Sequence, residues 1–180
     1  MESREIHVAP DRFELSSGEG LLVTELSSAI GLCLYDAAEE AGALLHLRCI
    51  VKSSKPADVT DTTLATELLL LDRCLQSLRE AAPTARDLQA RIVAHLTETP
   101  QARTVYDSVI SLVKRFLEDQ QVTLLPDDVS TGQPRRLRFR PNMGWCTPWP
   151  ELACAPEAKP QSRRPSVTPS SGCSASGSRM

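Results

Sequence analysis

Three apolar runs, at residues 21–23, 30–35 and 43–51, constrain the fold of this 180-residue chain more than any other feature. The first two are separated by the small polar pair Ser27 and Ser28, a pattern typical of buried strands joined by a tight bend. The second and third are separated by an acidic turn, Ala-Glu-Glu-Ala-Gly at residues 38–42, that ends in glycine. We therefore predict that residues 30–35 and 43–51 pair as a β-hairpin, which places His46 beside the strand that follows Ala29.

Two longer segments have helical periodicity. Residues 58–80 predict an amphipathic helix with Asp58 or Thr60 as its cap and Pro83 beyond its end, and its inner stripe is Leu64, Leu68, Leu71, Leu75 and Leu78. Residues 100–120 predict a second helix, because Thr99 is a good cap and Pro100 fits the first helical position. Its expected inner stripe is Val105, Val109, Leu112, Val113 and Phe116.

Between and after the helices the pattern returns to strands. Residues 88–95 alternate in a way that favours a strand with one face packed inward, and residues 122–125 predict a short buried strand. Residues 136–140 alternate arginine with apolar residues, which suggests a solvated edge strand that resists strand addition rather than an anion site. The element order predicts a mixed α/β domain over residues 1–146, followed by a disordered Pro/Ser-rich tail at 147–180.

Composition excludes several classes of function. The chain has 20 Lys and Arg against 23 Asp and Glu, a net charge of −3, so we expect no nucleic-acid partner. No apolar run approaches the ~20 residues that span a bilayer, so we expect no membrane insertion and a cytoplasmic location. The six cysteines lack zinc-site spacing and are predicted to be free thiols, mostly buried, and we expect no cofactor or metal.

Residues 23–36 (VTELSSAIGLCLYD) and 42–46 (GALLH) resemble the active-site stretch of the CheD family, the chemoreceptor glutamine deamidases of bacterial chemotaxis. In that family the run Gly-Ser-Cys-Val-Ala-Val-Cys-Leu-Tyr-Asp carries the nucleophilic cysteine, and Gly-Gly-hydrophobic-hydrophobic-His carries the histidine. Alignment on Cys33 to Asp36 retains the histidine as His46 and places Ala29 at the nucleophile. The resemblance spans about residues 6–145 and includes Asp61-Thr62 and the segment from 122 to 136.

Several family glycines are absent from this chain, and glycine permits backbone angles that other residues avoid. Ser27-Ser28 replaces Gly-Ser before the nucleophile position, and the loop back to Thr24 is one residue shorter. Residues 92–95, which end in His95, replace a segment that has a glycine pair near the family's active site, and the turn at 130–134 keeps one glycine of two.

The resemblance implies paired β-sheets flanked by helices in α/β/β/α layers. It also implies the conversion of a receptor glutamine to glutamate, with His46 as the base and Thr24 near the third catalytic position. The implied partners are the cytoplasmic helices of methyl-accepting chemoreceptors and a CheC-type phosphatase. Because a methyl group cannot attack an amide, we expect this copy to be inactive or weakly active and to act by binding these partners.

Other interpretations of these residues stay open. The chain is alternatively an active deamidase with Ser28 or Cys33 as nucleophile, or a structural adaptor unrelated to receptors. However, Cys33 lies roughly 13 Å along a regular strand from position 29, and Cys49 points to the face opposite His46. His46 and Thr24 also fit ordinary strand residues, and we expect His7 and His95 to be solvated or structural. Trp145 and Trp149 are expected to pack at the end of the domain.

Overall fold

The computed structural model describes residues 4–49, 61–143 and 145–149, and it contains two β-sheets. The smaller sheet has the order β1-β3-β9-β10, made of β1 (Glu5–His7), β3 (Leu21–Leu26), β9 (Arg135–Arg140) and β10 (Trp145–Trp149). The larger has the order β2-β5-β4-β6-β7, made of β2 (Arg12–Ser17), β5 (Ala41–Arg48), β4 (Ala29–Asp36), β6 (Gln89–Leu96) and β7 (Thr123–Leu124). A short strand, β8 (Asp128–Thr131), also pairs with β6, and a 3-10 turn, η1 (Pro141–Met143), links β9 to β10.

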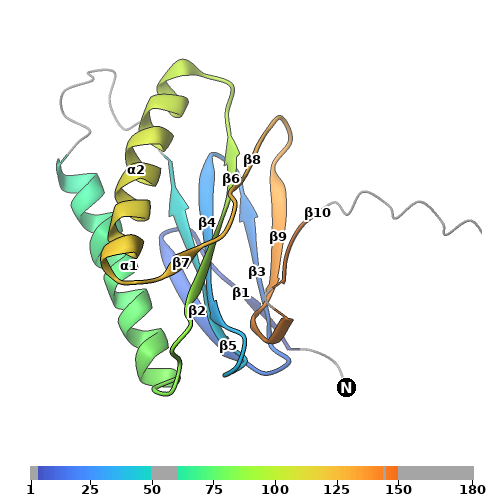
Figure 1. The fold of residues 1–180 in the computed structure, drawn as a ribbon. Helices are drawn as coiled ribbons and strands as arrows, with labels where there is room; N and C mark the ends of the chain where they lie inside the picture. Colours follow the sequence, from blue (N-terminus) through green and yellow to red (C-terminus); the bar gives the residue numbers. More distant parts are fainter. Residues whose placement is uncertain (1–3, 50–60, 144, 150–180) are drawn as a thin grey trace, which may run out of the picture.

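Both helices, α1 (Asp61–Ala81) and α2 (Pro100–Asp119), lie against the same face of the larger sheet, and the smaller sheet covers its other face (Figure 1). The prediction of a mixed α/β fold with paired sheets and helices outside is therefore confirmed. The layer order among the described residues is helices, larger sheet, smaller sheet, so a second helical layer over the smaller sheet is not found in those residues.

The predicted hairpin is confirmed as β4 and β5, which pair antiparallel with Gly31 opposite His46 and Tyr35 opposite Gly42. On its other side β4 pairs antiparallel with β6, with Ala29 opposite His95. The tight bend at Ser27-Ser28 carries the chain from β3 in the smaller sheet to β4 in the larger one. Ser28 has a φ of 50°, a left-handed conformation that non-glycine residues seldom adopt. This bend places Thr24 and Ala29 in facing layers.

Side chains alternate along the central strands, so the core has two parts. Ile30, Leu32 and Leu34 of β4 point to the helices, whereas Ala29, Cys33 and Tyr35 point to the smaller sheet. The predicted strand at 88–95 and its inward face are confirmed in β6, but the other face is covered as well. Ala90, Ile92 and Ala94 pack under the helices, and Val93 packs between the sheets, because β6 lies inside a covered sheet.

The helices match their predicted extents closely. Thr99 caps α2, with its hydroxyl accepting the amide hydrogen of Ala102. The buried stripe of α2 is Ala102, Tyr106, Val109, Ile110, Val113 and Leu117, so it is rotated from the predicted one and leaves Leu112 half-buried. Leu71, Leu75 and Leu78 of α1 are buried as predicted, together with Cys74, whereas the proposed caps Asp58 and Thr60 lie outside the described residues.

The prediction that β9 is an edge strand was wrong, because β9 pairs with β3 on one side and with β10 on the other. The alternation of arginine with apolar residues arises from a sheet with only one covered face, not from an edge. β10 runs to Trp149 and so passes the predicted domain boundary at 146, while residues 150–180 lie outside the described part of the chain. The disordered tail therefore stays a prediction.

Candidate functional site

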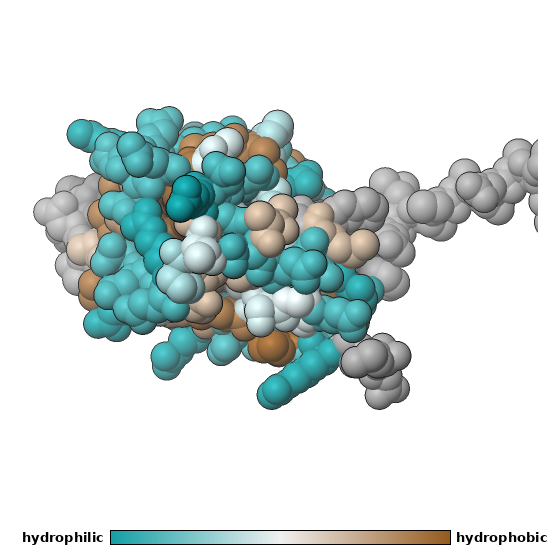
Figure 2. Space-filling model, turned by 60° about the horizontal axis from the view of Figure 1, so that its bottom comes forward, coloured by the Kyte–Doolittle hydropathy of each residue, from teal (hydrophilic) through white to brown (hydrophobic). Residues whose placement is uncertain are grey.

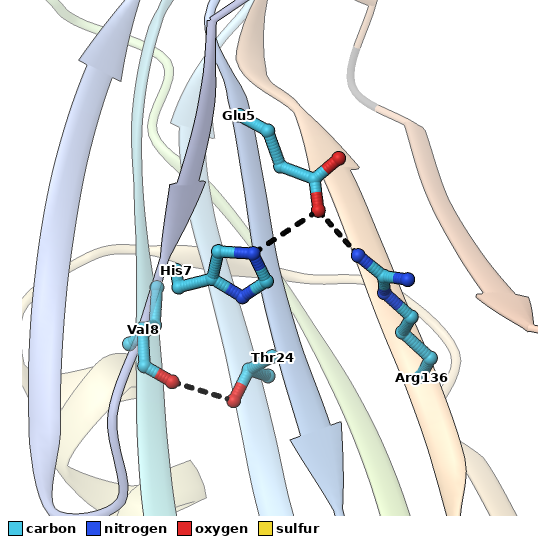
Figure 3. Close-up of polar contacts among 5 residues, drawn as sticks. All are labelled: Glu5, His7, Val8, Thr24 and Arg136. Atoms are coloured by element: carbon cyan, nitrogen blue, oxygen red, sulfur yellow. Dashed lines mark hydrogen bonds and ion pairs between the residues drawn. The ribbon is translucent and has the colours of Figure 1, made fainter.

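The two side chains that the family resemblance singles out, His46 and Thr24, are in direct contact between the sheets. His46 lies on β5 and Thr24 on β3, and His46 Nδ1 is 2.7 Å from Thr24 Oγ1. Both residues are 3% exposed. The Thr24 hydroxyl also donates a hydrogen bond of 2.8 Å to the carbonyl oxygen of Val8, just after β1 (Figure 3).

This arrangement fixes the tautomer of His46. A threonine hydroxyl has one hydrogen, and that hydrogen is donated to Val8. Thr24 Oγ1 must therefore accept its second bond, so Nδ1 of His46 is the protonated ring nitrogen. Nε2 then keeps its lone pair, which is the state that a general base needs.

The environment of His46 also favours the neutral ring. Burial lowers the pKa of His46 below its usual range, and Arg48 adds to this effect, although Asp11 opposes it. Asp11 and Arg48 form a half-exposed ion pair on β5 and the turn before β2, with Arg48 Nε 2.7 Å from Asp11 Oδ2. His46 is therefore uncharged, and the opposite charges of the neighbouring Asp11 and Arg48 balance each other.

Ala29 lies on the same face as His46 and is fully buried. Because Arg48 is opposite Ala29 and His46 is opposite Gly31, Ala29 and His46 form a diagonal cross-strand pair, whose side chains are typically about 7–8 Å apart. A longer side chain at this position would approach the imidazole. The methyl group of Ala29 instead packs with the apolar residues between the sheets.

The sequence did not indicate the role of His95, which lies directly opposite Ala29 on β6. It is 3% exposed, its Nδ1 accepts the backbone N–H of Ser28 at 3.2 Å, and its Nε2 is 3.1 Å from the carbonyl oxygen of Gly132. His95 is therefore buried and hydrogen-bonded at both nitrogens, which rules out the solvated alternative and agrees with a structural one. A single histidine in an alternating strand gave no signal of this contact, because its partners come from two distant turns.

The other proposed nucleophiles lie in surroundings that give less support to a catalytic role. The hydroxyl of Ser28 bonds to the hydroxyl of Thr97, which is not a base. Cys33 is fully buried, further along β4. Cys49 is buried as well, and burial, with a smaller contribution from Glu67, raises the pKa of its thiol to about 12, so it stays protonated at neutral pH.

Other polar residues lie away from this site. His7 is exposed on the outer face of the smaller sheet, where it contacts Glu5 at 3.3 Å (Figure 3). In residues 4–49, 61–143 and 145–149 no cluster of His, Cys, Asp or Glu is suited to hold a metal ion. Neither described helix is long and apolar enough to cross a bilayer. Cys33, Cys49 and Cys74 are buried and form no disulfide, as expected for cysteines in this part of the chain.

Comparison with known proteins gives distant relatives of one kind. No model of a known protein family matches the chain. A curated protein of Burkholderia thailandensis, described as a probable chemoreceptor glutamine deamidase CheD 1, is 20% identical over 143 residues, which cover 78% of this chain and 61% of that protein. A Burkholderia mallei protein described as a probable chemoreceptor glutamine deamidase CheD is 19% identical over 141 residues, or 77% of this chain and 60% of the relative.

Among solved structures, a crystal structure of a Neisseria meningitidis protein with the family description DUF152 covers 72% of this chain and 64% of its own. It has 13% sequence identity and a TM-score of 0.44. This chain spans about three fifths of the length of the curated relatives it matches. The resemblance inferred from residues 23–46 thus extends over most of the chain, which is a distant homologue of proteins curated as probable CheD chemoreceptor glutamine deamidases.

Proposed function

We propose that this chain is a chemotaxis protein of the CheD type that binds a chemoreceptor or a CheC-type phosphatase and has lost efficient deamidation. The observation that carries the proposal is the His46–Thr24 contact on the face that also carries Ala29, the residue that aligns with the family's nucleophile. A site with a base and its orienting group but no nucleophile supports a binding role better than a catalytic one.

The chemistry explains why one atom matters. In a cysteine-dependent deamidase, the histidine takes the thiol proton, and the thiolate sulfur attacks the side-chain carbonyl carbon of glutamine. The carbon–nitrogen bond then breaks as the histidine passes that proton to the departing ammonia. Water then cleaves the thioester and leaves glutamate. His46, neutral with Nε2 unprotonated, fits the base in this scheme, but Ala29 supplies no electron pair for the first bond.

The alternative in which Ser28 or Cys33 replaces the thiol has less support. Serine needs an aligned base to lose its proton, and the hydroxyl of Ser28 is engaged with Thr97. Cys33 is enclosed in the core between the sheets. A structural adaptor that binds no receptor would have the same site geometry. Only a binding measurement therefore distinguishes the adaptor from the proposed receptor-binding protein.

The test combines ammonia release with binding. The full chain and its His46→Ala variant are mixed with a purified chemoreceptor cytoplasmic domain, with a curated CheD protein as the positive control. We expect equal background ammonia release from both forms, and saturable binding of the receptor domain or of a CheC-type phosphatase. Release by the unmodified chain well above that of His46→Ala contradicts the loss of activity, whereas absence of binding to both partners supports the adaptor.

A further inference from the structure

The outer face of the smaller sheet carries a row of arginines with no role in the site described above. Leu137 and Phe139 of β9 are fully buried against the larger sheet, so the alternate residues Arg136, Arg138 and Arg140 project from the opposite face. On β3 they lie beside Glu25 and Val23, and on β10 they are paired in register with positions 149, 147 and 145. We call these three residues the arginine row.

The position of β9 inside the sheet excludes the usual explanation for such a row, which is protection of a sheet edge. Charged residues often guard an exposed sheet edge against strand addition. However, β9 is an inner strand with neighbours on both sides. The row therefore lies in the middle of a sheet face, and no helix of the described residues covers that face (Figure 1).

Charge is compensated at only one end of the row. Arg136 forms an ion pair with Glu5, which also contacts His7 (Figure 3). Arg138 and Arg140 have no ion-pair partner among residues 4–49, 61–143 and 145–149 and are half-exposed, whereas other arginines of the described chain, such as Arg48 and Arg135, are paired with aspartates. Two half-exposed guanidinium groups with five donors each thus lie on this face without an ion-pair partner among the described residues.

The spacing of the row indicates the shape of its partner. Alternate residues of a strand are about 6.6 Å apart, and side chains every four residues along an α-helix are about 6 Å apart. Carboxylates on one face of a helix therefore match consecutive arginines, and guanidinium groups bind carboxylates through paired hydrogen bonds. Residues 150–180 are a poor occupant, because they contain more Lys and Arg than Asp and Glu.

We propose that the arginine row docks an acidic helix of a partner protein, with glutamates every four residues along the contacting face. The contact depends on charge and spacing rather than on a large apolar patch. Figure 2, in which the bottom of the molecule is turned forward from the view of Figure 1, shows a mainly hydrophilic surface with separate apolar areas. This proposal is independent of the function proposed above, since it requires no receptor and no deamidation.

The test measures binding of a fluorescein-labelled designed helix with glutamates every four residues to the full chain, by fluorescence anisotropy at low and physiological salt. A second helix carries glutamine at the same positions, and a third carries the same glutamates scattered around its circumference. We expect the aligned Glu helix to bind roughly tenfold more tightly than either of the others, with weaker binding at higher salt.

Variants locate the contact. Arg138→Gln/Arg140→Gln should weaken binding of the aligned helix about tenfold, whereas Arg73→Gln/Arg115→Gln, at exposed positions on α1 and α2, changes net charge equally and should leave binding unchanged. Arg138→Lys/Arg140→Lys keeps the charge and the stems, and it should lose affinity about threefold because lysine lacks the planar fork. Thermal unfolding checks that each variant is folded.

Three results overturn the proposal. The first is equal binding of the aligned Glu, scattered Glu and Gln helices, which needs only the unmodified chain and so remains decisive if a variant fails to fold. The second is an equal loss of affinity in the two glutamine double variants, which assigns the effect to net charge. The third is tighter binding of a single-stranded oligodeoxynucleotide of equal charge, which assigns the row to polyanions in general.

Discussion

The two ends of strand β4 differ in what their polar residues do. At the Asp36 end, the carboxylate accepts four backbone N–H bonds, from Ala38 and Glu39 in the turn to β5 and from Arg86 and Asp87 in the loop before β6. At the Ala29 end, His46 bonds to Thr24, and the Thr24 hydroxyl donates to the carbonyl oxygen of Val8. The side chain of Ala29 contributes no polar atom there.

The contrast explains which part of the family pattern is retained. Asp36 is needed by the fold, because without it four amides of two turns lose their acceptor. A thiol at position 29 is needed only by chemistry, and a methyl group packs between the sheets without leaving a polar atom unpaired. If position 29 corresponds to the family's nucleophile, as proposed, its replacement by alanine costs little stability, whereas loss of the Asp36 carboxylate costs much more.

The sharpest test of the contrast is Asp36→Ala, for which we expect the largest effect. The free energy of unfolding, measured by urea denaturation, should fall by about 3 kcal/mol, because unsatisfied amides cost about 1–3 kcal/mol each when buried and less where water reaches them. Burial acts to raise the pKa of Asp36, but the backbone N–H bonds outweigh it and the pKa is lowered. The charged form is therefore the stabilising one.

The control is Glu39→Ala in the same turn, whose side chain is exposed and which should change stability by less than about 0.5 kcal/mol. Asp36→Asn keeps the shape of the side chain but leaves only one accepting oxygen. Its loss of unfolding free energy should therefore fall between the values for Glu39→Ala and Asp36→Ala. A loss below about 1 kcal/mol for Asp36→Ala contradicts the structural role of this end.

Alanine substitutions of two glycines, one toward each end of the β4–β5 hairpin, should give the next largest loss of stability. A Cβ on Gly42, opposite Tyr35, would lie 2.7 Å from the carbonyl oxygen of Leu34, which is backbone and cannot move aside. A Cβ on Gly31, opposite His46, would lie 2.6 Å from Cδ2 of Leu137, the end of a flexible side chain. Thermal denaturation should show a loss of about 2–3 kcal/mol for Gly42→Ala and about 1 kcal/mol for Gly31→Ala. The reverse order contradicts the packing.

Much of the fold could be predicted from the sequence, because its information is local. Apolar runs with a glycine-ended turn predicted β4 and β5, and Thr99-Pro100 predicted the start of α2. The sheet partners of β9 could not be predicted, since an arginine at every second position is compatible with an edge strand and with an inner strand that has one open face. Nor did the pattern indicate β1 and β2, which are short and polar on their outer sides.

For the candidate site, the sequence predicted that His46 lies beside the strand of Ala29, because hairpin register follows from the turn. The contact of Thr24 with His46 depends on how two sheets stack, and only the family resemblance suggested it. The family resemblance places residues 92–95 near the active site, but it did not predict that His95 lies opposite Ala29. Its position follows from the pairing of β4 with β6, which are far apart in sequence and joined through α1.

The Ala29 end can be tested by restoring the thiol. Ala29→Cys alone should release ammonia from a chemoreceptor cytoplasmic domain only slightly above the unmodified chain, because His95 occupies the backbone N–H of Ser28, a candidate donor to the developing oxyanion. Ala29→Cys/His95→Gly should be about tenfold faster, which corresponds to about 1.4 kcal/mol in the barrier.

The matched control is Ala29→Cys/His95→Gly/His46→Ala, which should return ammonia release to background because no base remains. Alkylation of position 29 followed by mass spectrometry verifies that the new thiol is accessible. Full activity of Ala29→Cys alone contradicts a blocking role for His95 and leaves the missing sulfur as the sole defect of the site.

The smallest expected effect concerns the charge state of His46. Its pKa is lowered in the folded chain chiefly by burial, so the unfolded chain binds a proton first as the pH falls through the usual value of 6.5. The stability that the neutral ring contributes is therefore fully present above that pH and is lost on acidification below it. Urea denaturation between about pH 8 and pH 5 should show a steeper decline for the unmodified chain than for His46→Gln, which cannot titrate. Asp36 and His95 are unchanged in both proteins, so the difference in slope reports His46 alone.

Parallel curves would mean that the imidazole is not held neutral between the sheets, and the argument that its Nε2 is available as a base would fail with it.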